Sequence, residues 1–210
     1  MGGWLWAQPA APQRQPLAGK IIVLDPGHAV FNESGKLINP GAHGRHGVQE
    51  RDVVLNVAAK LAPLLEAQGA RVFLTRTQEN PWRYSTGRHS DNRARAIFAN
   101  VMRADVYVRL HCDWNRNKRF KGFTTYYFRW GSRRLAKNID HALAQALPEH
   151  KNRGLHRRAF VSITSRMPAV LLEMGVLSNK QEGKDLSTDA FQSRLAEAIS
   201  TGLVNYFQGS

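Results

Sequence analysis

The sequence predicts a single α/β domain with a mainly parallel, twisted sheet flanked by helices. Three observations support this fold class. The chain has 210 residues, the size of one compact domain. Short apolar runs typical of strands alternate with longer stretches whose apolar residues recur at helical spacing. No internal repeat divides the chain, so we expect one hydrophobic core and no second domain.

The first half of the chain is predicted to alternate strands with helices. Gly69 follows the first helical stretch as a natural stop, and Ser90 or Asp91 is suited to cap the second. In order, the expected elements are a strand at Lys20–Asp25, a helix at Arg51–Gln68, a strand at Ala70–Thr75, a loop at Arg76–His89, a helix carrying Ala94, Ile97, Phe98 and Val101, and a strand at Asp105–His111.

The second half continues the same alternation after a basic loop. Its strands are aromatic, β-branched or aliphatic runs, and its last helix carries an apolar stripe. In order, the expected elements are the loop Asp113–Lys121, a strand at Gly122–Trp130, a helix at Ser132–Leu147, a short strand at Ala159–Thr164, a buried strand at Pro168–Leu172 and a helix at Thr188–Phe207.

The two ends of the chain differ in composition from its body. Residues 1–19 hold Pro, Gly and Trp without periodicity, so we expect a flexible tail. The sequence leaves three origins open for it: an arbitrary flexible tail, residues of cloning origin, or the remnant of a secretory signal peptide. Residues 20–207 form the expected domain, and residues 208–210 a second short tail.

The net charge of +14 and the isoelectric point of about 10.6 favour an anionic partner. Composition does not choose among nucleic acid, anionic lipid and anionic wall polymer. No nucleic-acid-binding signature supports the first, and no apolar run approaches the ~18 residues of a membrane span. The single cysteine, Cys112, excludes an internal disulfide and a multi-cysteine zinc site.

Ionisable residues follow three of the predicted strands at their carboxyl ends. These residues are His28, His111 and Glu173, and ligands bind beyond the carboxyl ends of strands in open α/β sheets. Glu50 follows a glycine-studded loop that can reach the same edge. Two imidazoles and one carboxylate suit Zn²⁺ with an open position for water, and a further carboxylate can carry the proton. The spacing alone leaves open that each is an ordinary hydrogen-bonded residue.

Two other arrangements of reactive residues are less favoured. His43, His46 and Glu50 lie close in sequence, but the intervening glycines disfavour the helix that would bring them together. Cys112 is predicted to point to the opposite face of its strand from His111, which argues against a thiol–imidazole pair. The remaining histidines stand in basic, polar surroundings and are expected at the surface: His89, His141, His150 and His156.

Seven motifs, in matching order and spacing, carry a resemblance to a known family. They are Leu24–His28 (LDPGH), Gly41–Ala58 (GAHGRHGVQERDVVLNVA), Phe73–Thr77 (FLTRT), Asp91–Asn100 (DNRARAIFAN), Ala104–Asp113 (ADVYVRLHCD), Arg153–Leu155 (RGL) and Pro168–Asn179 (PAVLLEMGVLSN). The sequence resembles the zinc-dependent N-acetylmuramoyl-L-alanine amidases of the cell-wall amidase type 3 group. The resemblance implies that His28, Glu50 and His111 bind one Zn²⁺ and that Glu173 is the catalytic carboxylate.

The same resemblance implies the activity and its setting. The substrate would be peptidoglycan, cut between N-acetylmuramic acid and the L-alanine of the stem peptide, in cell-wall remodelling or lysis by an autolysin. We then expect a monomeric, extracytoplasmic enzyme, secreted to the wall or periplasm, that does not bind nucleic acid. Its basic surface would suit anionic wall polymers. A protein of the same fold that holds wall peptides and cuts nothing is the alternative.

Three features depart from the family pattern or bear on the cleft. The segment between His28 and Gly41 is longer than the usual glycine-rich version. Arg109 shares a strand face with His111, where it either contacts a substrate carboxylate or hydrogen-bonds locally. The interval between His111 and Glu173 leaves little room for the helix that blocks the zinc in some members, so an open site is expected.

Overall fold

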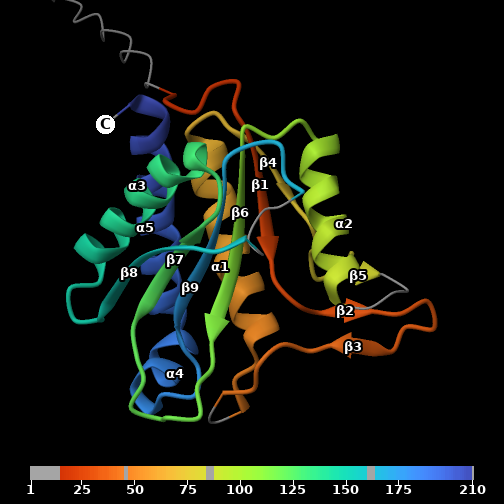
Figure 1. Ribbon diagram of the computed structural model, residues 1–210, viewed down its shortest axis with the longest axis vertical. Coiled ribbons are helices and arrows are strands. Elements are labelled where there is room, and N and C mark those ends of the chain that lie inside the picture. The colour runs from red at the N-terminus through yellow and green to blue at the C-terminus, as the bar shows by residue number, and fades with distance from the viewer. Residues whose placement is uncertain (1–14, 45–46, 84–87, 160–163, 210) are drawn as a thin grey trace, which may run out of the picture.

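The computed structural model describes residues 15–44, 47–83, 88–159 and 164–209. Its centre is a six-stranded sheet in which the neighbouring strands are parallel, except for one antiparallel pair, β7 with β9 (Figure 1). This arrangement confirms the predicted α/β class. In spatial order the strands are β4 (Arg71–Leu74), β1 (Ile21–Pro26), β6 (Val106–Asp113), β9 (Ala169–Val176), β7 (Phe123–Tyr127) and β8 (Asn152–Arg157).

Helices cover both faces of this sheet. One face packs against α1 (Glu50–Ala67), α3 (Trp130–Ala146) and α5 (Asp189–Gln208), whereas α2 (Arg88–Val101) covers the other (Figure 1). Side chains alternate along the strands accordingly: Ile22 and Leu24 belong to the large core, and Val23 belongs to the smaller core with α2. A short helix, α4 (Lys180–Leu186), follows β9.

Several boundaries differ from the sequence expectations. β6 continues past His111 to Asp113, and β9 continues through Glu173 to Val176. The sequence does not predict the edge strand β8, because its six residues are polar or only partly buried and show no apolar pattern. The strand expected at Ala159–Thr164 falls largely outside the described residues.

The apolar residues of α2 do not all face the core. Val101 is 66% exposed and Ile97 is 43% exposed, although both belong to the apolar residues that recur at helical spacing. The helix instead turns Arg95 inward, together with Ala96 and Ala99. The reason is electrostatic. Arg95 forms buried ion pairs with Asp25 and Asp91, and these pairs fix which side of α2 faces the sheet.

The long segment after His28 forms part of a second, small sheet. It comprises β2 (Val30–Phe31), β3 (Leu37–Asn39) and β5 (Trp82–Arg83), in the order β3-β2-β5. Figure 1 shows β2 and β3 projecting to one side of the main sheet, beyond the end of β1. The long segment between His28 and Gly41 therefore forms two short strands beside the carboxyl end of the main sheet, where the predicted site residues lie.

The domain begins before Lys20. Leu17 is fully buried in the large core, and its N–H donates to the carbonyl of Gln68 after α1. The expected tail of residues 1–19 thus includes part of the core, and residues 1–14 lie outside the described part. Among the described residues, no helix has both the length and the apolar character that a membrane span requires.

Candidate metal centre and active site

Three of the predicted site residues meet at the carboxyl end of the sheet. His28 follows β1, Glu50 begins α1 and His111 lies near the end of β6. Glu50 Oε1 lies 2.8 Å from His28 Nε2 and 3.1 Å from His111 Nδ1, and the two imidazole nitrogens are 3.0 Å apart. One ligand atom from each side chain lies within 4.8 Å of the others, so the three can hold a single ion.

Backbone donors orient the Glu50 carboxylate. The N–H of Ala42 donates to Oε2 at 2.8 Å and the N–H of Cys112 donates to Oε1 at 3.0 Å. Burial alone would raise the pKa of Glu50, but hydrogen bonds with His111 and His28 outweigh it and hold the pKa below its usual range. Glu50 is therefore an ionised carboxylate whose position is fixed.

Asn39 orients the His28 ring. His28 Nδ1 lies 3.0 Å from Asn39 Oδ1, which can only accept a hydrogen bond. The ring then carries its proton on Nδ1 and leaves the lone pair of Nε2 free toward Glu50 and His111, as a metal ligand requires. Asn39 could not be predicted from the sequence, since a single asparagine in the long insertion carries no recognisable signal.

The His111 ring packs directly against Gly27. A Cβ built at Gly27 would overlap the ring atoms of His111, so only glycine fits there. Burial lowers the pKa of His111 to about 4, although the neighbouring Glu50 opposes the shift. His111 is therefore neutral near pH 7, the state in which imidazole binds metal.

Gly27→Ala should disrupt the centre without changing a ligand. The added methyl group overlaps the His111 ring and displaces Nδ1 from Glu50. We expect zinc affinity to fall by at least about tenfold, the lower end of what misplaced ligand orientation costs. Isothermal titration of the variant with Zn²⁺ measures this. Gly35→Ala is the control. A methyl group there would meet nothing within 4 Å, so this variant carries only the conformational cost of a non-glycine residue at a φ of +79°. Unchanged affinity in Gly27→Ala would contradict the packing.

Glu173 faces the same centre from the neighbouring strand. It pairs in register with His111 across the parallel β6–β9 ladder, and paired residues share a sheet face. Its Oε2 is buried and has no hydrogen-bond partner among the described residues. Burial, reinforced by the negative charges of Glu50 and Asp113, raises the pKa of Glu173 well above its usual value. Glu173 thus brings a carboxyl oxygen with no partner among the described residues to the centre.

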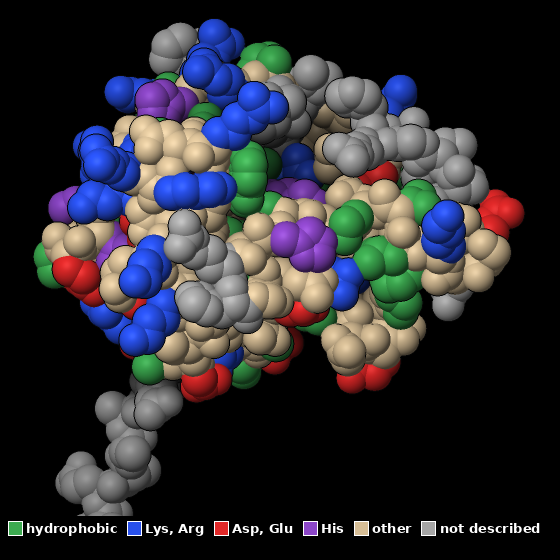
Figure 2. Space-filling view, turned by 90° about the horizontal axis from the view of Figure 1, so that it is seen from below, with side chains coloured by type: hydrophobic (Ala, Val, Ile, Leu, Met, Phe, Trp, Pro, Cys, Tyr) green, Lys and Arg blue, Asp and Glu red, His purple; other side chains and the backbone are tan. Residues whose placement is uncertain are grey.

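These four residues line one cleft of about 380 Å³. Figure 2 views the molecule from this end, with histidine side chains near the middle and Lys and Arg side chains gathered mostly over the left half. The other lining residues come from the β3–α1 segment and the end of β6: Asn39, Pro40, Gly41, Ala42, Cys112, Asp113 and Trp114.

Arg109 does not line this cleft. It is 3% exposed, and its Nε donates to Asp25 Oδ2 at 3.0 Å while its Nη2 donates to Asn92 Oδ1 at 2.5 Å. Its charge is therefore neutralised within the fold. Of the two roles that the sequence allows for Arg109, this geometry favours local hydrogen bonding over contact with a substrate carboxylate.

The side chains of the other candidate residues are not part of the three-ligand cluster. Cys112 is buried in the core on the opposite strand face from His111, as expected. His43 is exposed, and His46 lies outside the described residues. His150 is expected at the surface, but it is largely buried within 3.5 Å of Glu182 and of Asp185. A cavity of about 450 Å³ beside His150 is lined by two ion pairs, His150 with Glu182 and Arg194 with Glu149.

Comparisons with known proteins agree with the fold. The family model described as N-acetylmuramoyl-L-alanine amidase matches residues 22–205. The protein named probable cell wall amidase LytH, from Staphylococcus aureus, is 30% identical over 196 residues, which are 93% of this chain and 61% of that protein. The chain thus spans about three fifths of the length of this curated relative.

Two solved structures are similar along nearly their whole length. The N-acetylmuramoyl-L-alanine amidase AmiC2 of Nostoc punctiforme superimposes with a TM-score of 0.78 at 27% identity, covering 91% of this chain and 99% of that one. The catalytic domain of CwlV from Bacillus (Paenibacillus) polymyxa var. colistinus gives 0.77 at 28% identity, covering 91% and 99%. The chain therefore belongs to the N-acetylmuramoyl-L-alanine amidase family.

Proposed function

We propose that this protein is a zinc-dependent amidase that cleaves the bond between N-acetylmuramic acid and the L-alanine of the peptidoglycan stem peptide. The observation that carries the proposal is the convergence of His28, Glu50 and His111 beside a carboxyl group, Glu173, whose Oε2 has no partner among the described residues. Membership of the amidase family supports the choice of bond.

The residues present fit a zinc ion. Two imidazoles and a carboxylate form one of the common ligand sets of catalytic zinc, which keeps a position open for water. The three ligand atoms lie together, and each side chain is oriented by a second contact: Asn39 for His28, two backbone N–H groups for Glu50 and Gly27 for His111. Glu173 remains free of this set.

In the proposed mechanism of amide hydrolysis, three residues bind the metal ion and Glu173 transfers the proton. A zinc ion held by His28, Glu50 and His111 would acidify a water molecule and polarise the carbonyl of the scissile amide. Glu173 accepts a proton from the attacking water and delivers it to the departing amine nitrogen. Burial and the negative charges of Glu50 and Asp113 raise the pKa of Glu173, which makes its carboxylate a stronger base than a free one.

Crystallography at the zinc absorption edge tests the metal assignment. We expect one anomalous peak between His28, Glu50 and His111, and loss of peptidoglycan hydrolysis when a chelator removes the ion. An anomalous peak elsewhere, or full activity of metal-free protein, would contradict the proposal.

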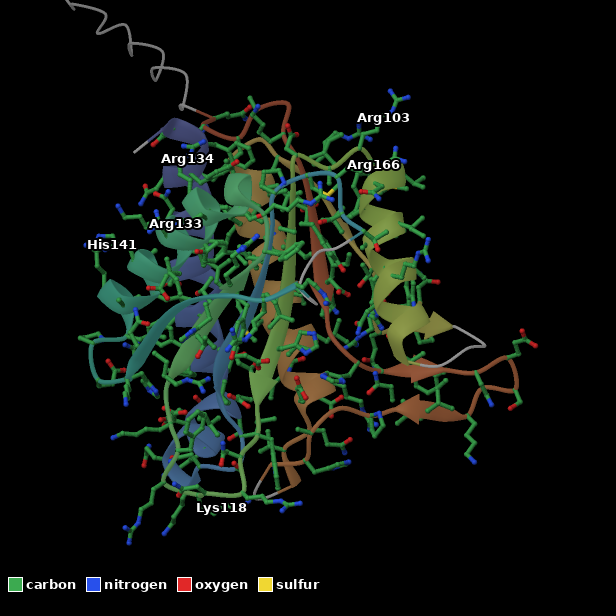
Figure 3. The ribbon with its side chains drawn as sticks, viewed as in Figure 1. Arg103, Lys118, Arg133, Arg134, His141 and Arg166 are labelled. Carbon is green, nitrogen blue, oxygen red and sulfur yellow. The ribbon has the colours of Figure 1, made fainter. Side chains whose placement is uncertain are left out.

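We further propose that the basic half of the cleft end attracts anionic wall polymer. The loop between β6 and β7 carries four exposed cations, Arg116, Lys118, Arg119 and Lys121. It directly follows Trp114, which lines the cleft, and Lys118 Nζ lies 4.2 Å from the Trp114 ring centroid. Figure 3 shows Lys118 at this end of the molecule, whereas Arg103 and Arg166 lie at the opposite end.

Replacing these four loop cations with Gln should weaken binding to intact sacculi by several-fold at low salt, and less at physiological salt, because exposed charges are screened. Hydrolysis of a short soluble muropeptide should change little. The control replaces Arg103, Arg133, Lys137 and Arg166 with Gln, the same loss of charge on exposed residues away from this loop. Co-sedimentation with sacculi measures binding. Equal loss in both variants would show a non-specific effect of net charge.

The substrate sets the expected place of action. Peptidoglycan lies outside the cytoplasmic membrane, so the proposed enzyme acts there, in wall remodelling or lysis. We also propose that it acts as a monomer. The described residues between β6 and β9 form β7, α3 and β8, and the ligands line an accessible cleft. This supports a site that needs no displacement of a blocking helix.

A further inference from the structure

The backbone that carries His28 adopts an unfavourable conformation. His28 has a φ of +64° and Ala29 a φ of +51°, left-handed values at two consecutive residues that have a Cβ. The sequence places no glycine at either position to relieve this cost. The surrounding structure must therefore hold the loop in place.

Two buried arginines hold three consecutive carbonyl groups of this loop. Arg76 donates from Nε to the oxygen of Pro26 and from Nη2 to that of Gly27, both at 2.9 Å. Arg95 donates from Nη1 to the oxygen of Pro26 at 3.2 Å and from Nη2 to that of His28 at 2.8 Å. Both arginines are at most 4% exposed, so these four bonds are shielded from water.

Arg76 also reaches the segment that carries the second ligand. Its Nη2 donates to the carbonyl oxygen of Arg51 at 2.7 Å. Arg51 directly follows Glu50 in the first turn of α1. One guanidinium group thus ties the His28 loop to the start of the helix that presents Glu50.

Arg95 is connected to the strand that carries the third ligand. It pairs with Asp91 at 3.0 Å and with Asp25 Oδ1 at 2.8 Å. The other oxygen of Asp25 accepts from Arg109, which lies two residues before His111 on β6. Two buried carboxylates, Asp25 and Asp91, thus pair with Arg95 and Arg109. The contacts of the network join all three ligand-bearing segments.

We propose that Arg76 and Arg95 are positioning residues that preform the metal centre, an inference that rests on the proposed zinc site. Neither arginine contacts a ligand side chain in the described network; both act through the backbone. Without their hydrogen bonds the His28 loop relaxes from its left-handed conformation, and His28 Nε2 moves away from Glu50 and His111. Zinc affinity then falls while the rest of the fold persists.

Arg76→Lys and Arg95→Lys in the full chain test this. Lysine keeps the positive charge but donates from one nitrogen and loses the guanidinium fork. We expect the zinc dissociation constant, measured by competition with a chromophoric chelator, to rise by about 10- to 100-fold. The control is Tyr107→Phe, which removes a buried hydrogen bond to Asp25 Oδ2 without touching the loop. It should lower the melting temperature and leave the dissociation constant unchanged.

A second measurement needs no metal. The Gly27 N–H donates to the carbonyl of Leu110 at 3.0 Å, and its hydrogen exchange reports on the loop. In metal-free protein both lysine variants should exchange this amide faster, while Tyr107→Phe should not do so selectively. Wild-type protection of Gly27 together with a wild-type dissociation constant would overturn the proposal.

The two proposals fail in different ways. If the wild type binds no zinc, the proposed metal is wrong, and Gly27 exchange still decides the role of the arginines. If Arg95→Lys does not fold, Arg76→Lys decides, because Arg76 forms no ion pair with a carboxylate among the described residues.

Discussion

Glu173→Gln should retain zinc and lower turnover by roughly 10²- to 10⁴-fold, the usual contribution of a general acid–base group. Glutamine keeps the size of the side chain but cannot accept the proton of the attacking water. The three ligands His28, Glu50 and His111 are complete without Glu173, so metal binding should not change. Zinc content, melting temperature and amide hydrolysis, measured on the same preparation, test the role.

The three measurements separate three roles for Glu173. Joint loss of zinc and activity would make it a ligand. A lower melting temperature with a fully active folded fraction would make it structural. Near-normal turnover with zinc retained would contradict the mechanism outright. Glu197→Gln, on an exposed position of α5, is the matched control and should change none of the three.

His111→Ala should abolish both zinc binding and hydrolysis. The variant loses one of three ligands and leaves Glu50 Oε1 without its partner at 3.1 Å. The remaining histidine and carboxylate would hold zinc too weakly to retain it through dialysis. Metal analysis after dialysis and an assay on purified peptidoglycan measure the two losses.

His141→Ala is the control for this substitution. His141 is exposed on α3 and lies away from the cleft end of the molecule (Figure 3). The control should keep wild-type zinc content and turnover. Full zinc content in His111→Ala would exclude His111 as a ligand and with it the proposed centre.

The parts of the fold and site that could be predicted depend on local patterns. The run Lys20–Asp25 and the alternating Asp105–His111 form strands because β-branched and aliphatic residues fill buried positions. Parallel neighbours place their carboxyl ends at one edge, which is why the sequence alone could assign His28, His111 and Glu173 to one site.

The parts that could not be predicted depend on polar contacts between distant residues. Arg95 pairs with Asp25 across 70 positions, and that pairing rotates α2 away from its apolar stripe. Asn39 orients His28 from an insertion whose two short strands show no clear periodicity. The edge strand β8 could not be predicted either, because its residues are polar or only partly buried and show no apolar alternation. Such contacts follow from the assembled fold and leave no periodic signal in the sequence.

Product analysis of digested peptidoglycan tests the central claim most directly. Purified sacculi are incubated with the zinc-loaded protein, and new amino termini are labelled and identified by mass spectrometry. The proposed activity predicts stem peptides with a free L-alanine amino terminus, released together with glycan chains that keep intact N-acetylmuramic acid. Sacculi that bind the protein but release no such termini would contradict the account and identify a wall-binding protein instead.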